Sequence, residues 1–121
     1  MLHFVSVGKA GDFPEGKMRA FRLGETEIAV ALIKGRFHAF SNICTHRYAN
    51  LSDGFVIDGQ IVCGEHEATY DPATGSILYG PAFEPLPVYP VRVEGDEVKV
   101  GWREALGADE VIPLPTGADQ S

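Results

Sequence analysis

The alternation of hydrophobic and polar positions along the chain predicts short β-strands rather than helices. Runs of about four to eight residues alternate in polarity or are rich in β-branched side chains, as half-buried strands require. Apolar stretches of helical length are scarce. Strands are expected at Phe4–Val7, Met18–Leu23, Glu27–Ile33, Phe37–Phe40, Gln60–Cys63, Ser76–Leu78, Tyr89–Val93 and Glu97–Val100.

Glycine and proline mark the turns between these strands. Lys34-Gly35 and Gly95-Asp96 each separate two apolar runs, and glycine permits the positive φ that a tight hairpin turn needs. From Pro81 to Pro90, four prolines exclude a helix or an inner strand and favour an extended cover over another part of the chain. The sequence therefore predicts an all-β fold.

Two segments break the alternation and are expected to form ordered loops. Residues 41–59 are rich in Asn, Ser, Asp and Gly, and they contain Cys44 and His46. Residues 64–75 begin after an apolar pair and contain His66. The residues with metal-binding chemistry are thus concentrated in two loops.

The length and charge of the chain limit its organisation and its partners. The 121 residues suffice for one domain, expected at residues 1–100, and a loosely attached extension at residues 101–121. Ten Lys and Arg against 17 Asp and Glu give a net charge of −7, which repels nucleic-acid phosphates and anionic lipids. Neither nucleic acid nor a membrane surface is expected as a partner.

The expected location is the cytoplasm. The N-terminus lacks the basic start and apolar stretch of a secretory signal, and no apolar run is long enough to span a membrane. In a reducing compartment Cys44 and Cys63 are expected to be thiols available for chemistry rather than a disulfide.

The candidate chemistry lies in the pattern C-x-H-x16-C-x2-H, formed by Cys44, His46, Cys63 and His66. Each loop pairs one soft thiolate with one imidazole, a ligand set that suits zinc or an iron–sulfur centre better than magnesium or calcium. A Cys–His nucleophile would use one pair and leave the other unexplained. Zinc fingers place like ligands together, whereas this arrangement fits two irons, one bound by thiolates and the other by imidazoles.

With their neighbours, these residues make the chain resemble Rieske-type [2Fe-2S] ferredoxins from about Phe4 to Val100. The resemblance rests on the segments Cys44-Thr45-His46-Arg47, Leu51-Ser52-Asp53-Gly54, Ile61-Val62-Cys63-Gly64-Glu65-His66, Tyr70-Asp71, Thr74-Gly75 and Pro90-Val91-Arg92-Val93. It implies stacked antiparallel sheets with a tip made of two loops. It also implies one [2Fe-2S] cluster, held there by the two cysteines and two histidines of the motif.

The resemblance implies an electron carrier and not an enzyme. The expected function is the ferredoxin of a multicomponent aromatic-ring dioxygenase, which passes electrons from a flavin-dependent reductase to the terminal oxygenase. An oxygenase would need a further iron bound by two histidines and a carboxylate, and only His3 and His38, expected to be ordinary strand residues, are left over. No nucleotide-binding glycine motif is present. Two alternatives stay open, the small subunit of an assimilatory nitrite reductase and a zinc-stapled binding domain.

Departures from the family pattern concern the surroundings of the cluster. Members bound in respiratory complexes carry two further cysteines, so this chain resembles the soluble, oxygenase-associated branch. Ala68 stands where the high-potential branch has a serine that donates to a bridging sulfide, which predicts a low reduction potential of roughly −150 mV. Tyr70 stands where that branch has a donor to a ligand thiolate, and is expected to raise this value.

Residues beside the histidines are expected to form a docking surface. Glu65 and Glu67 flank His66, and Arg47 on the other loop offsets part of their charge. Such an acidic rim would attract a basic partner surface and make electron transfer sensitive to salt. Tyr48 is a further candidate contact at this tip.

Overall fold

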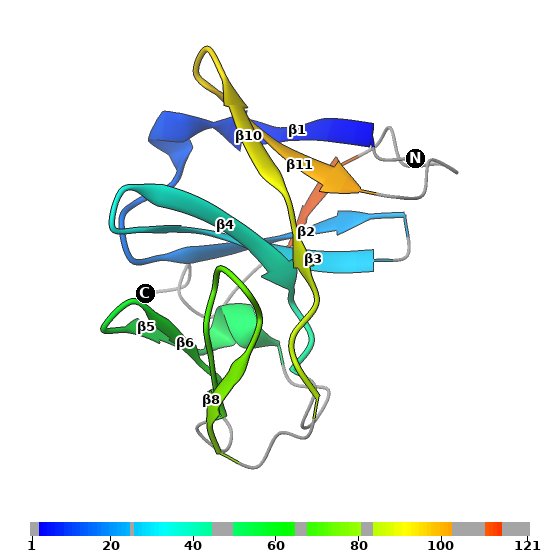
Figure 1. Cartoon of the computed structure of the whole chain (residues 1–121). Helices are drawn as coiled ribbons and strands as arrows, with labels where there is room; N and C mark the ends of the chain where they lie inside the picture. The colour runs from blue at the N-terminus through cyan, green and yellow to red at the C-terminus, as the bar shows by residue number, and fades with distance from the viewer. Residues whose placement is uncertain are drawn as a thin grey trace.

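Three antiparallel sheets lie in layers in the computed structural model, which describes residues 3–24, 26–44, 50–64, 68–80, 84–102 and 111–114. The first sheet has the strand order β1-β11-β10, the second β12-β2-β3-β4-β9 and the third β5-β6-β7-β8. Figure 1 shows the second sheet between the other two. The elements are β1 (His3–Lys9), η1 (Ala10–Asp12), β2 (Met18–Leu23), β3 (Thr26–Ile33), β4 (Arg36–Ser41), η2 (Leu51–Asp53), β5 (Phe55–Ile57), β6 (Gln60–Val62), β7 (Thr69–Tyr70), β8 (Ile77–Tyr79), β9 (Val88–Tyr89), β10 (Val91–Glu94), β11 (Glu97–Trp102) and β12 (Val111–Leu114).

The middle sheet contributes to a separate core on each of its faces. Because successive side chains of a strand point to opposite faces, Ile28 and Val30 of β3 enter one core and Ala29 and Ala31 the other. The first core is shared with β1 and β11. The second core, shared with the third sheet, contains Met18, Ala29, Ala31, Ile33, Phe40, Cys44, Leu51, Ile61, Cys63, Ala68, Tyr70 and Leu86.

Tight turns fix the register of the hairpins. Lys34 and Gly35 both have positive φ (53° and 79°), and the carboxylate of Glu15 accepts hydrogen bonds from both of their backbone N–H groups. Gly95 also has a positive φ of 63° between β10 and β11. Both predicted hairpins are therefore confirmed.

The predicted strands are present, but Tyr89–Val93 is two strands rather than one. Val88 and Tyr89 pair with β4 in the second sheet, whereas the residues after Pro90 pair with β11 in the first. Proline has no backbone N–H to donate, so it suits the point at which the chain changes sheets. The Pro90 carbonyl accepts a hydrogen bond of 2.8 Å from Gly101.

Three strands arise where the sequence predicted loops or a loose end. β5 lies within the expected loop 41–59, and β7 lies within the expected loop 64–75. At two and three residues these strands are too short to show alternation. Within the extension expected at residues 101–121, Val111–Leu114 forms β12, which pairs with β2 at the edge of the second sheet.

The described part of the proline-rich strip is extended, as predicted, and covers the second core. Leu86 is buried there, and its N–H donates to the carbonyl of Gly75 over 2.8 Å. Ser41 donates to the carbonyl of Pro87, which carries the strip into β9 at a sheet edge. The prediction that this region holds no inner strand is confirmed for residues 84–90.

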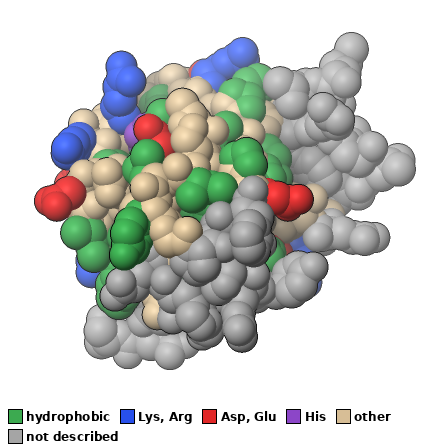
Figure 2. Space-filling model, turned by 60° about the horizontal axis from the view of Figure 1, so that its bottom comes forward, with side chains coloured by type: hydrophobic (Ala, Val, Ile, Leu, Met, Phe, Trp, Pro, Cys, Tyr) green, Lys and Arg blue, Asp and Glu red, His purple; other side chains and the backbone are tan. Residues whose placement is uncertain are grey.

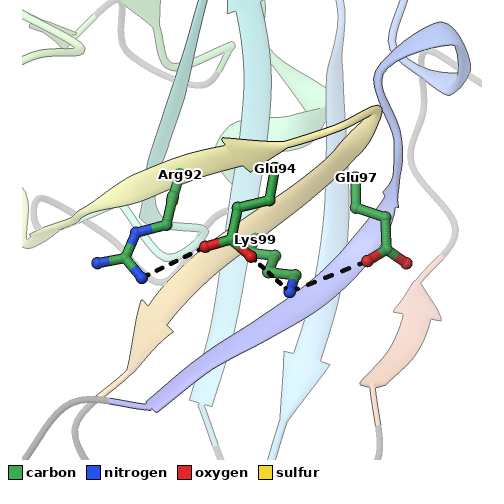
Figure 3. A network of polar contacts seen from close by, with 4 residues as sticks. All are labelled: Arg92, Glu94, Glu97 and Lys99. Carbon is green, nitrogen blue, oxygen red and sulfur yellow. Dashed lines mark hydrogen bonds and ion pairs between the residues drawn. The ribbon is translucent and has the colours of Figure 1, made fainter.

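The outer surface of the first sheet carries a charge network (Figure 3). Lys99 Nζ lies 2.9 Å from Glu94 Oε1 and 3.9 Å from Glu97 Oε1, and Arg92 Nη1 lies 3.4 Å from Glu94 Oε2. The hydrogen bond between Glu94 and Lys99 lowers the pKa of Glu94 and raises that of Lys99. The first sheet and the cysteine-containing core lie on opposite sides of the middle sheet, so this network belongs to the surface away from the site.

His38 gives a pH-dependent prediction. Burial on β4 lowers its pKa, Arg36 lowers it further, and Asp71 acts in the opposite direction. We expect an NMR titration of the ring to give a pKa below the usual value of about 6.5. Arg36→Gln should raise this pKa and Asp71→Asn should lower it.

The same shift affects stability. Because folding lowers this pKa, the unfolded chain binds more protons, and the His38 contribution to stability declines as pH falls from about 6.5 through the folded pKa. A folded pKa at or above the usual value, or shifts of opposite sign in the two variants, would contradict this assignment.

Candidate metal centre

Cys44 and Cys63 reach the same core from two different loops. Cys44 follows β4 and Cys63 follows β6, and both side chains are buried with Leu51 and Tyr70. The two cysteines are not joined as a disulfide. The structure therefore brings together the two thiols that the sequence predicted as metal ligands.

Tyr70 reaches one of these sulfur atoms from β7. Its hydroxyl oxygen lies 3.4 Å from Cys44 Sγ, and the side chain is fully buried. A phenol can donate a hydrogen bond to a thiolate, and such a bond is strongest in a dry environment. The contact places the Tyr70 hydroxyl within reach of Cys44, and its action on a ligand sulfur stays a prediction.

The first loop is anchored at both ends by Asn42. Its N–H donates to the Glu27 carbonyl over 3.0 Å, and its own carbonyl accepts from Leu51 over 2.7 Å. Its buried side-chain oxygen accepts a further bond of 2.9 Å from the N–H of Ser52. Asn42 thus joins the chain before Cys44 to the turn of η2 that follows the loop.

The second loop is the connection of a hairpin. Cys63 N–H donates to the Ala68 carbonyl over 2.8 Å, directly beyond the strand pair formed by Val62 and Thr69. Ala68 is fully buried in the same core. The ligand cysteine is therefore fixed by the backbone at the base of this loop.

The two loops touch each other at Gly54. A Cβ atom placed on this glycine would lie 2.2 Å from the Val62 carbonyl oxygen and 3.0 Å from the Gly64 nitrogen. The φ of Gly54 is −92°, so close approach of backbone, not a positive φ, requires glycine here. The turn that ends the first loop thus packs directly on β6, the strand that leads into the second loop.

Six residues predicted for the site and its docking surface lie outside the residues that the structure describes, namely His46, Arg47, Tyr48, Glu65, His66 and Glu67. Among the described residues, no three histidine, cysteine or acidic side chains form a metal-binding group. The described part of the centre consists of Cys44, Cys63 and Tyr70.

These three residues fit an iron–sulfur cluster. Two thiolates buried in one apolar core repel each other and are poorly solvated, so they need a bound cation to offset their charge. Thiolates are the ligands of iron–sulfur clusters, and a hydrogen bond to a ligand sulfur is one means by which a protein tunes them. Tyr70 can supply such a bond.

Sequence reasoning missed Asn42, the role of Gly54 and the contact of Leu86 with the core. Asn42 stands two residues before a predicted ligand, where a small polar side chain is a signal for a loop anchor. Gly54 belongs to a quoted family segment, but its steric role depends on a neighbouring strand that the sequence does not display. Leu86 is the apolar residue between two prolines in the predicted cover.

The fold and the site define a small all-β domain with a two-loop, cysteine-containing metal centre. The family model of the Rieske [2Fe-2S] domain matches residues 3–90. The chain therefore belongs to the Rieske [2Fe-2S] family, and its cofactor is a [2Fe-2S] cluster.

Two relatives resemble the chain over most of their own length. The ferredoxin component of the naphthalene 1,2-dioxygenase/salicylate 5-hydroxylase systems of Ralstonia sp. is 36% identical over 96 residues, which cover 79% of this chain and 92% of the relative. A solved chain from a complex of reduced oxygenase and oxidised ferredoxin in carbazole 1,9a-dioxygenase is 33% identical. It has a TM-score of 0.75, and the match covers 79% of this chain and 99% of that chain.

A second solved structure shares the fold alone. A chain from Mycobacterium tuberculosis, proposed to be the small subunit of an NADH-dependent nitrite reductase, has a TM-score of 0.78, but its sequence identity is 19%. The match covers 87% of this chain and 99% of that subunit. In the described part of the chain, no helix has the length and apolar character needed to cross a membrane.

The contact between the loops predicts that Gly54→Ala impairs assembly of the cluster. The added methyl group must displace the β6 backbone, and overpacking of this kind costs about 1–3 kcal/mol. We expect less iron and sulfide per protein and a lower unfolding temperature. Gly11→Ala is the matched control, because a Cβ there meets nothing within 4 Å. Equal cluster content in both variants would show that the two loops can move apart without loss of the cluster.

The contact of Tyr70 with Cys44 predicts that Tyr70→Phe lowers the reduction potential. A hydrogen bond to a ligand sulfur stabilises the more negative, reduced state, and a difference of about 1 kcal/mol corresponds to roughly 40 mV for one electron. Tyr79→Phe, an exposed change on the same sheet, should leave the potential unchanged. If Tyr70→Phe leaves the reduction potential unaltered, the Tyr70 hydroxyl makes no such bond to the Cys44 sulfur when the cluster is bound.

Proposed function

We propose that the chain is the ferredoxin component of a multicomponent aromatic-ring dioxygenase. In this role it accepts one electron at a time from a flavin-dependent reductase and delivers it to the terminal oxygenase. The observation that carries the proposal is the pair of buried cysteines at the base of the two loops. The chain that holds them aligns with 92% of the length of a ferredoxin component of a dioxygenase system. The substrate is chosen by the oxygenase, so the carrier itself needs only a redox centre and docking surfaces.

The proposed ligand set divides the two irons between the two residue types. Cys44 and Cys63 hold one iron, and His46 and His66 hold the other. The burial of both thiols in one core and the mixed ligand pattern of each loop support this assignment. The cluster, when bound, supplies a site for one electron.

The residues around the cluster control how strongly the added electron is stabilised. Leu51, Ile61 and Leu86 enclose the thiolates in an apolar core, which strengthens the contact of Tyr70 with Cys44. With neutral imidazoles the oxidised site carries no net charge and the reduced site carries one negative charge. Hydrogen-bond donors near sulfur therefore favour reduction.

Charges beside His66 are proposed to guide the partners. Glu65 and Glu67 flank His66 in the sequence and are proposed to form an acidic rim, and Arg47 and Tyr48 belong to the segment that contains His46. Basic residues around the partner's cofactor would meet this rim and speed the encounter, and salt would slow it.

The cytoplasm is the proposed location. The ligand thiols must remain reduced to bind iron, and a cytosolic environment maintains that state.

The relative from Ralstonia is a ferredoxin component of an enzyme system rather than its oxygenase, which supports the role of a separate carrier.

A reconstituted electron-transfer chain tests the function. The purified protein should be red-brown, contain iron and sulfide, and take up one electron reversibly. NADH should reduce it only when the flavin-dependent reductase is present, and the oxidised terminal oxygenase should then reoxidise it. His66→Ala should abolish the Rieske electron spin resonance signal and this transfer, whereas the control His38→Ala should retain both.

The same preparation separates the alternatives. The zinc-stapled domain is set aside by the match to the Rieske [2Fe-2S] family. A protein that occurs only as a subunit of a nitrite reductase, with no transfer to an oxygenase, would establish the second alternative.

A further inference from the structure

The strand register of the third sheet places four side chains in one row on its outer face. Phe55 pairs with Val62, Val62 with Thr69, and Thr69 with Tyr79. Directly paired residues of antiparallel strands lie on the same side of a sheet. The opposite face carries Ile61 and Tyr70 into the core.

The outer face of this sheet exposes three large apolar side chains: Phe55 and Tyr79 at the two ends of the row, and Ile57, two residues after Phe55 on β5. The exposed fractions of Phe55, Ile57 and Tyr79 are 56%, 50% and 69%. Figure 2, in which the bottom of Figure 1 has come forward, shows several hydrophobic side chains exposed on this side of the molecule. A contiguous group of exposed apolar side chains is typical of an interaction site.

The row borders a groove that reaches the metal centre. The groove has a volume of about 370 Å³ and is lined by Phe55, Ile57, Val62, Cys63, Gly64, Thr69 and Tyr79. Among these described lining residues none is charged, although the chain as a whole carries a net charge of −7. The described lining of the groove therefore suits an apolar group of a partner.

We propose that this groove is a docking site for the terminal oxygenase, which inserts an apolar side chain between Phe55 and Tyr79. The inference rests on the proposed function. An electron leaves from the centre that Cys63 helps to form, so the interface with the acceptor includes the tip, and the groove continues that interface along the third sheet. The oxygenase is favoured because a related ferredoxin was solved in complex with one.

The small number of exposed apolar side chains around this groove favours a transient partner over a second copy of this chain. A stable interface buries roughly 800 Å² on each partner, whereas short-lived electron-transfer contacts are smaller. The exposed side chains of Phe55, Ile57 and Tyr79 around one groove form only the centre of such a contact.

The test compares two double variants of the full chain with bound cluster. Phe55→Thr with Tyr79→Thr removes the apolar walls of the groove and keeps residues that suit strands. Val93→Thr with Ile112→Thr is the matched control, because these exposed apolar residues lie on the first and second sheets. Reduced protein is mixed with oxidised terminal oxygenase, and the transfer rate is followed against oxygenase concentration by stopped flow.

The groove variant should require an oxygenase concentration about tenfold higher for half-maximal rate, as loss of central aromatic contacts predicts. Its reduction potential, cluster content and salt dependence should match those of the wild type and the control. An unchanged half-maximal concentration would overturn the proposal, as would a defect confined to the reductase step or a change in oligomeric state. Wild-type protein that reduces no oxygenase would overturn the proposed function as well.

Discussion

Burial of two thiols from separate loops in one apolar core is the constraint on which the structure of this domain depends. Cys44 and Cys63 are fully enclosed, and a buried thiolate pair is costly unless a metal offsets its charge. The surrounding backbone is organised to meet this constraint. Asn42 joins the two ends of the first loop, the Cys63–Ala68 hydrogen bond closes the second, and Gly54 lets the two loops touch.

The three sheets have different roles in the domain. The middle sheet is buried on both faces, so it connects a purely structural core to the core that contains the cysteines. Small residues of β3, Ala29 and Ala31, face the cysteine-containing core, and Ala29 pairs with the large Phe40 on the same face. The charged network of Lys99 and Glu94 lies on the first sheet, whereas the apolar groove lies on the third. This charge network and the apolar groove thus lie on different sheets.

The sequence predicted the all-β class and most strands because alternation and turn residues are local signals. The Asp58-Gly59 pair, with positive φ at both residues, also marks the hairpin of β5 and β6, yet the polar residues before it hid β5 within an expected loop. β12 depends on pairing with β2, which local pattern does not report. The two cysteines and Tyr70 were predicted from motif spacing and family resemblance. The steric role of Gly54 requires knowledge of which backbones meet, so it emerged only from the fold.

The most direct test of the account is a Mössbauer spectrum of the oxidised and reduced protein enriched in the Mössbauer-active iron isotope. If Cys44 and Cys63 share one iron and the histidines bind the other, the spectrum will show two unequal sites in equal amounts. One site should have only sulfur ligands and the other sulfur and nitrogen ligands, and the added electron should reside on the second. Two equivalent irons, or cysteines divided between the irons, would contradict the shared thiolate site that the buried pair implies.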